Sequence, residues 1–264
     1  MVDISCGSSH SLAIDNNGLI YSWGNGQGGR LGHNQEVGEN APRQIKELAS
    51  KHVKYIEAGD ASSACITHDL MVYMWGSGLN GRLGNGTNSF QLQPQLSQEL
   101  KDKQVCSIFK GTNSTFAILE TGHVYGWGSS KNGKLGFALS KGKNYDLPRE
   151  IITLDGNMLY QIAAGPFHTI MLTTEGNLLS MGNSKDGKLG YHLQAGNVVD
   201  GEEPQRILCG SVPKGTQFFC NTQVATIIKQ YPLFDDYDEF SKLRSLYVKD
   251  APYEINQIVC GDNF

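Results

Sequence analysis

The chain has 264 residues with a formal net charge of −4, and 39% of its residues are hydrophobic. This composition supports one large domain or two small ones, and the nearly balanced charge does not indicate binding to chromatin or to an acidic membrane. No apolar run is long enough for a membrane span, and the six cysteines form no C-x-x-C pair, so we expect an intracellular protein, cytoplasmic or nuclear. No histidine motif has the spacing of metal ligands, and we expect no metal or cofactor.

From its first residues onward the chain repeats one unit, which begins with a glycine. The unit glycines are Gly7, Gly59, Gly111 and Gly165. Each is followed by an apolar run, a turn such as Asn17-Gly18, and a return strand that reads IYSW, VYMW, VYGW or LLSM. The last position of that strand holds Trp23, Trp75 and Trp127, with Met181 in the fourth unit. Because residues two apart in a strand share one face, the Tyr and Trp positions are predicted to form the buried face of each unit.

A glycine-rich loop follows each return strand. The four loops read GNGQGGRLG, GSGLNGRLG, GSSKNGKLG and GNSKDGKLG, and they begin at Gly24, Gly76, Gly128 and Gly182. The third loop is one substitution away from a nucleotide-binding P-loop, because Leu135 stands where that motif needs Ser or Thr. A phosphate site is built once, at a strand-to-helix junction, whereas four copies at a period of about 50 residues predict a structural turn.

Each loop ends in a basic residue, a leucine and a glycine. The basic residues are Arg30, Arg82, Lys134 and Lys188, and the leucines, predicted to be structural, are Leu31, Leu83, Leu135 and Leu189. Radial symmetry would place the four cations around one face. They then either form a positive crescent that binds an acidic protein or a phosphate backbone, or pack their stems over their own loops with the charges solvated.

The period predicts four repeats, at about 1–53, 54–105, 106–159 and 160–208. The register is then lost, and 209–253 is predicted to be an insertion, either merely tolerated or able to bind a partner through its acidic and aromatic residues. Gly261 occupies the place of a unit glycine, so 254–264 is expected to start a further, truncated repeat of a larger protein.

Short strands joined by tight turns at this period are typical of an all-β propeller. The unit resembles the repeat of the regulator of chromosome condensation family, over residues 1–208 and 254–264. The resemblance rests on the unit glycine, the His or Ser three residues later, the G-x-V-Y-x-W-G strand and the G-[RK]-L-G turn. The resemblance implies a seven-bladed propeller with four strands per blade, of which this chain holds about four blades and part of another.

The resemblance implies two classes of function. One is a non-catalytic protein-interaction scaffold whose loops on one face hold a partner; the alternative is a guanine-nucleotide exchange factor for a Ran-like small GTPase. Neither makes a covalent bond, and no catalytic constellation stands out from the repeat positions. The family's third known role, as a UV-B photoreceptor, needs tryptophans beyond the repeat position, and this sequence has none.

In the family's exchange factor, residues in the turn after the unit glycine contact the GTPase. The residues of this sequence that match those positions are Asp60, Asn113 and Asp262. The unit histidines, His10 and His168, are interpreted instead as bonding to neighbouring parts of the repeat. No hairpin follows the second unit in the place where the exchange factor carries its nucleotide-displacing wedge, and this favours the scaffold.

Overall fold

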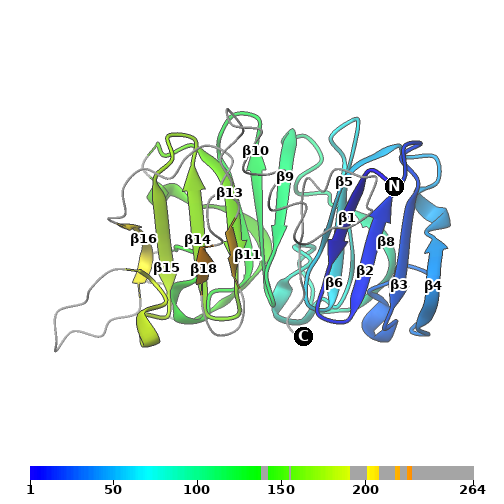
Figure 1. The fold of residues 1–264 in the computed structure, drawn as a ribbon, viewed down its shortest axis with the longest axis horizontal. Helices are drawn as coiled ribbons and strands as arrows, with labels where there is room; N and C mark the ends of the chain where they lie inside the picture. Colours follow the sequence, from blue (N-terminus) through cyan, green and yellow to red (C-terminus); the bar gives the residue numbers. More distant parts are fainter. Residues whose placement is uncertain (138–141, 155, 191–200, 208–217, 221–224, 228–264) are drawn as a thin grey trace, which may run out of the picture.

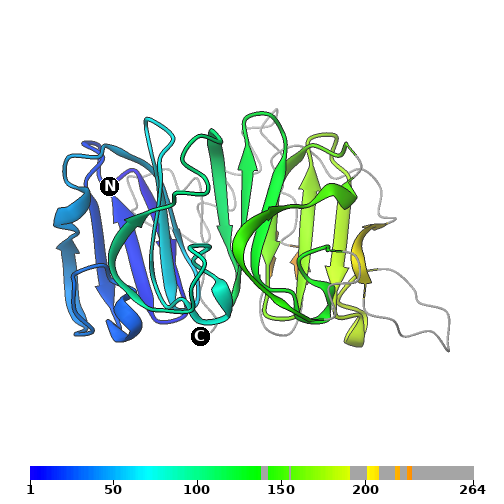
Figure 2. The same ribbon diagram turned by 180° about the vertical axis from the view of Figure 1, so that it is seen from behind.

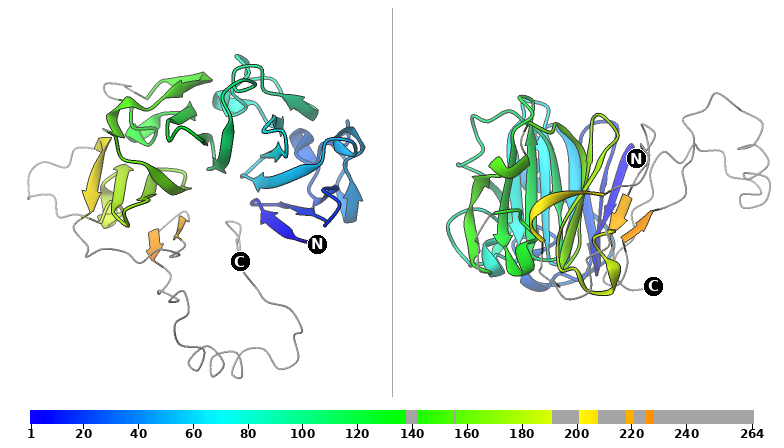
Figure 3. Two further views of the ribbon diagram at one scale, coloured as in Figure 1. Left: turned by 90° about the horizontal axis from the view of Figure 1, so that it is seen from above. Right: turned by 90° about the vertical axis from the view of Figure 1, so that its left-hand side faces the viewer.

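The computed structural model describes residues 1–137, 142–154, 156–190, 201–207, 218–220 and 225–227. These residues form four antiparallel sheets of four strands each, which stand side by side (Figures 1 and 2). Seen from above, the sheets follow an arc with their first strands toward its centre (Figure 3). Each sheet is one blade, and the prediction of an all-β propeller is confirmed.

Every blade follows the same up-and-down order. Blade 1 contains β1 (Asp3–Cys6), β2 (His10–Ile14), β3 (Ile20–Gly24) and β4 (Glu39–Gln44). Blade 2 contains β5 (Val53–Ala58), β6 (Ser62–Thr67), β7 (Val72–Gly76) and β8 (Gln91–Leu96). Blade 3 contains β9 (Val105–Lys110), β10 (Ser114–Leu119), β11 (Val124–Ser129) and β12 (Asn144–Glu150). Blade 4 contains β13 (Leu159–Ala164), β14 (His168–Thr173), β15 (Leu178–Gly182) and β16 (Gly201–Ile207).

Short 3-10 turns connect the outer strands and the blades. They are η1 (Gln27–Gly29), η2 (Lys46–Leu48), η3 (Leu79–Gly81), η4 (Lys131–Gly133), η5 (Ile152–Leu154) and η6 (Lys185–Gly187). The P-loop-like string forms η4 and runs from one strand to the next, β11 to β12, rather than from a strand into a helix. The prediction of a structural turn is therefore confirmed.

The apolar core lies between blades. One cluster joins Leu12 and Ile20 of blade 1 to Ile56 and Trp75 of blade 2. Two further clusters join blade 2 to blade 3 and blade 3 to blade 4 in the same way. Leu83 and Leu135 belong to these clusters, and all four loop leucines are buried: Leu31, Leu83, Leu135 and Leu189. Because each blade buries its apolar face against the next blade, a single blade has no complete core of its own.

The arc continues past blade 4 with a short antiparallel hairpin, β17 (Phe218–Cys220) and β18 (Ala225–Ile227). Strand β17 contacts β13 and β14 of blade 4, as β5 contacts β1 and β2 at the junction of blades 1 and 2. The hairpin falls within 209–253, the range predicted to be an insertion. The rest of that range, and the further repeat predicted at 254–264 with Asp262, lie outside the described residues.

Candidate functional site

The tryptophan of the return strand acts between blades. Trp75 Nε1 of blade 2 donates to the carbonyl oxygen of Arg30 in blade 1 at 3.0 Å, and Ser63 Oγ donates to the same oxygen at 2.8 Å. One junction along, the carbonyl of Arg82 accepts from Trp127 Nε1 at 3.0 Å and Thr115 Oγ1 at 2.9 Å. Trp75 and Trp127 therefore each hold the basic-Leu-Gly turn of the preceding blade.

The final glycine of that turn makes room for the tryptophan ring. A Cβ atom placed on Gly84 would lie 2.7 Å from Trp127 Nε1, and one on Gly32 would lie 2.9 Å from Trp75 Nε1. At the junction of blades 3 and 4 the ring is replaced by Met181, whose side chain has no N–H group, and the carbonyl of Lys134 accepts from Thr169 Oγ1 at 2.8 Å. The G-[RK]-L-G pattern is thus explained by a contact with the next blade: the carbonyl of its basic residue accepts hydrogen bonds from that blade, and its final glycine makes room for the tryptophan ring where one is present.

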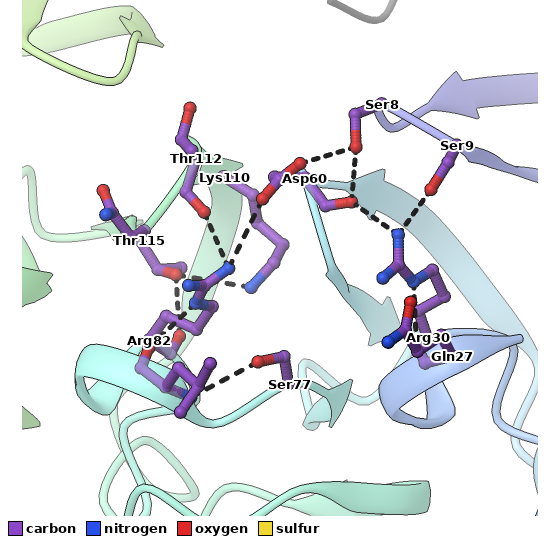
Figure 4. A network of polar contacts seen from close by, with 12 residues as sticks. Ser8, Ser9, Gln27, Arg30, Asp60, Ser77, Arg82, Lys110, Thr112 and Thr115 are labelled. Atoms are coloured by element: carbon purple, nitrogen blue, oxygen red, sulfur yellow. Dashed lines mark hydrogen bonds and ion pairs between the residues drawn. The ribbon is translucent and has the colours of Figure 1, made fainter. Parts of the chain in front are cut away.

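The basic side chains of the first three loops also reach across to the next blade. Arg30 Nη1 donates to Ser9 Oγ and, at 3.3 Å, to the carbonyl of Asp60. Arg82 Nη1 donates to the carbonyl of Thr112 at 2.8 Å. These bonds connect each loop with the turn that follows a unit glycine (Figure 4).

The two lysines of this position differ in their surroundings. Lys134 Nζ donates to the carbonyl of Pro166 in blade 4 at 2.9 Å and also to Asn113 Oδ1. Lys188 Nζ donates to the carbonyl of Lys185 within its own loop, at 2.9 Å. Burial lowers the pKa of Lys134 to about 8, and the charges of Arg82 and Lys131 act in the same direction.

Neither sequence-based interpretation of the four cations describes Arg82 and Lys134. The side chain of Arg82 is only 8% exposed and Lys134 is 1% exposed, so these two do not add to a positive surface. Their charged ends are bonded to the next blade, which also differs from a solvated charge over their own loop. Arg30 and Lys188 are partly exposed.

Asp60 and Asn113, the predicted contact residues, lie on two successive turns. The Asp60 carboxylate accepts from Ser8 Oγ of blade 1 at 2.6 Å and faces Arg82 Nη1 at 3.8 Å. Its side chain is nevertheless 36% exposed. The Asn113 side chain is the acceptor of Lys134, so both predicted residues already take part in bonds that stabilise the face.

His10 is buried between blades 1 and 2 and its ring bonds to Ser63 Oγ at 2.8 Å. Because the Ser63 hydroxyl gives its proton to the carbonyl of Arg30, Nε2 of His10 must be the donor. Nδ1 is then a bare acceptor, and it has no hydrogen-bond partner within the described structure. Burial, with the charges of Arg30 and Lys110, lowers the pKa of His10 to about 3, which keeps the ring neutral at pH 7.

Sequence reasoning did not single out Lys110. It ends β9 in the position that holds Cys6, Ala58 and Ala164 in the other blades. It is 9% exposed, and Nζ donates to Thr115 Oγ1 at 3.3 Å. Burial, then the charge of Arg82, lowers the pKa of Lys110 to about 7 against an opposing effect of Glu57. The available signal was a long cation in a position otherwise occupied by small residues.

Over the described residues, no group of three or more His, Cys, Asp or Glu side chains could hold a metal ion. No helix in the same part of the chain is long and apolar enough to cross a membrane.

Comparison with known proteins gives a consistent family. The model of the RCC1-like domain matches residues 1–231. The human E3 ubiquitin-protein ligase HERC2 is 33% identical over 213 residues, which cover 78% of this chain and 4% of HERC2. The ultraviolet-B receptor UVR8 of Arabidopsis thaliana is 34% identical over 192 residues, covering 72% of this chain and 43% of UVR8. The chain thus spans less than half the length of either relative.

A similar fold occurs in the crystal structure of Prp20p from Saccharomyces cerevisiae, a protein with binding properties toward Gsp1p and histones. The TM-score is 0.70 at 21% sequence identity, and the match covers 92% of this chain and 58% of Prp20p.

Proposed function

The chain belongs to the family of RCC1-like domains, and on this premise we propose that it is a non-catalytic protein-interaction scaffold. Its partner binds the turn face, which we define as the four turns after the unit glycines: residues 8–9, 60–61, 112–113 and 166–167. Binding loops carried on a rigid framework are a common way to build a recognition surface.

One observation carries this proposal: the turn face is held in register by bonds from blade to blade. Ser8 Oγ donates to the carbonyl of Asp60 at 2.8 Å, Arg82 binds the carbonyl of Thr112, and Lys134 binds that of Pro166. A surface that is already ordered loses little conformational entropy when a partner binds.

Backbone bonds hold the same turns to the repeat loops. The amides of Asn25, Ser77, Ser129 and Asn183 donate to the carbonyls of Ser9, Ala61, Asn113 and Phe167, each at 2.8 to 2.9 Å. All four turns therefore have the same support, and side chains such as Phe167 can project from it.

Phe167 offers a direct test of this face, because it is 44% exposed in the fourth turn. Met158, 51% exposed and just before β13, is a matched apolar control at the other end of that strand. In a capture experiment, partner proteins that bind the wild type should no longer bind the Phe167→Ala variant, and they should still bind the Met158→Ala variant. Equal capture by both variants would place the binding surface elsewhere.

The second candidate function is nucleotide exchange on a Ran-like GTPase. It is favoured by the partly exposed carboxylate of Asp60 on the turn face, and by the fold shared with Prp20p. An exchange factor binds the nucleotide-free GTPase more tightly than the loaded form, and by linkage this lowers nucleotide affinity. Because Asp60 is already engaged by Ser8 and Arg82, the scaffold remains the preferred function.

Release of fluorescent GDP from Ran separates the two functions. A scaffold leaves the release rate unchanged at micromolar concentrations of the protein. Acceleration that is lost with Asp60→Ala and retained with Asp102→Ala would replace the scaffold by an exchange factor. Asp102 suits this control because it is an exposed acid before β9, at the end of that strand away from the turn face.

A further inference from the structure

We propose that the junction of blades 2 and 3 binds an oxyanion, a carboxylate or a phosphate, through a cation cluster of Arg30, Arg82 and Lys110. Arg30 and Arg82 come from the loops of blades 1 and 2, and Lys110 ends the first strand of blade 3. Figure 4 shows Lys110 pointing from its strand toward Arg82, with Asp60 beside both arginines. This inference goes beyond the proposed function, because it concerns a small-ion site that needs no partner protein.

Lys110 stands where the repeat has no structural need for it. Blades 2 and 4 place Ala58 and Ala164 in this position, and their blades pack without a cation there. The stem of Lys110 instead lies against Gly59, where an added Cβ would come within 3.0 Å of Lys110 Cβ and 3.3 Å of Cε. Gly59 is a unit glycine present in every repeat, so the departure from the repeat lies in Lys110 alone, and such departures are expected at functional positions.

The ammonium group of Lys110 has fewer partners than its burial demands. It can donate three hydrogen bonds, and the structure gives it one, to Thr115 Oγ1. Lys110 forms no ion pair with any residue that the structure describes. A charge that is nine-tenths buried without a counter-ion is unfavourable unless something else neutralises it.

The nearby carboxylates do not fill this role. Glu57 Oε1 accepts from the backbone N–H of Lys110 at 3.3 Å, and Oε2 accepts from Tyr55 OH at 3.1 Å. Burial raises the pKa of Glu57 to about 7, so it is only partly ionised at neutral pH. The Asp60 carboxylate faces Arg82 at 3.8 Å, which is longer than a direct hydrogen bond.

The cluster therefore has unused donors and the lasting positive charge of its two arginines. Because the pKa of Lys110 is lowered to about 7, a bound anion would also favour the charged form of its ammonium group. Arginine and lysine donors together suit an anion with several oxygens, because charge-assisted hydrogen bonds are about twice as strong as neutral ones. The anion would enter from the turn face, where Arg30 and Asp60 are the partly exposed members. It would take the place next to Arg82 that the Asp60 carboxylate now approaches.

The first experiment is thermal unfolding of the whole chain during a phosphate titration at constant ionic strength. Lys110→Ala installs the residue that blades 2 and 4 already hold, and Lys110→Met preserves the stem should the alanine variant fold poorly. Lys54→Ala is the charge-matched control, because Lys54 is an exposed residue of the neighbouring strand β5. We expect phosphate to raise the Tm of the wild type and of Lys54→Ala, and to leave both Lys110 variants unchanged.

Direct binding of inorganic phosphate, measured calorimetrically, should be about tenfold or more weaker in the Lys110 variants, as expected for loss of one charge-assisted hydrogen bond. Acetate run in parallel separates the two sources of the anion: stabilisation by acetate as well indicates a carboxylate, and stabilisation by phosphate alone indicates a phosphate group. Two results would overturn the proposal, namely no phosphate effect on the wild type, or the same effect in the Lys110 variants.

Discussion

Trp75 and Trp23 occupy the same position of the same strand in neighbouring blades, yet their surroundings differ. Trp75 is fully buried and donates to the carbonyl of Arg30 in the preceding blade, and Trp127 repeats this one blade further on. Trp23 belongs to blade 1 and is only partly buried. The comparison teaches that the signature tryptophan derives its burial and its hydrogen bond from the neighbouring blade, and not from its own strand.

The largest effect is expected when a junction tryptophan is removed. Trp75→Ala should lower the free energy of unfolding by roughly 3 to 5 kcal/mol, because a fully buried aromatic side chain is lost and the Arg30 carbonyl loses one of its donors. Trp23→Ala is the matched variant and should cost about 1 kcal/mol, since part of its surface is already in water. Chemical denaturation measures both. Equal losses would show that the tryptophan acts within its own blade.

The glycine under the ring provides the next test. Gly84 has φ of +65°, and an added Cβ would meet Trp127 Nε1 at 2.7 Å, so Gly84→Ala combines backbone strain with overpacking. We expect it to cost about 2 to 4 kcal/mol in unfolding free energy. Gly187→Ala, at φ of +71° with no atom near the added Cβ, should cost only about 1 to 2 kcal/mol. A similar loss at the two sites would mean that the close approach of the ring is unimportant.

A smaller effect is expected from His10, which belongs to the same junction as Trp75. Its pKa falls from 6.5 to about 3 on folding, so the unfolded chain binds more protons between these values. The stability that depends on a neutral His10 is therefore complete above pH 6.5 and is lost as the pH falls below it. His10→Gln should weaken this loss between pH 7 and pH 5 by about 1 to 2 kcal/mol.

The difference between the wild type and His10→Gln, measured by urea denaturation at several pH values, isolates this contribution from other groups such as Glu57. Glu57 acts in the opposite sense, because its pKa is raised to about 7 and its contribution to stability is lost as the pH rises. Identical pH profiles for the two proteins would contradict the account of His10.

Most of the fold could be predicted from the sequence, because one repeat encodes its own strands and turns. Glycine spacing, the Asn17-Gly18 turn and the Tyr and Trp positions predict a blade, and four copies predict a propeller. The hairpin of β17 and β18 was missed for a specific reason. Cys220 pairs with Ala225 as Ala164 pairs with Thr169, so Asn221 stands where the other units have their glycine.

The site was harder to predict, because its contacts join residues of different repeats. Arg82 binds a turn 30 residues away, and its carbonyl accepts from a tryptophan 45 residues away. The sequence shows that all four repeat loops have a basic residue at the same position, but it does not indicate whether these charges face solvent or the next blade. The sequence does show that Lys110 is a long cation in a position that holds small residues in the other blades. Its significance depends on its burial and on its single hydrogen-bond partner, which only the structure shows.

Hydrogen exchange in Trp127→Ala tests most directly the claim that the repeat signature acts between blades. The amides of Gly84 and Gly136 occupy equivalent loop positions in blades 2 and 3, and each donates within its own turn at 2.9 Å. If Trp127 holds the loop of the preceding blade, the amide of Gly84 loses protection while that of Gly136 stays protected. Loss of protection at Gly136 with Gly84 unaffected would contradict the account.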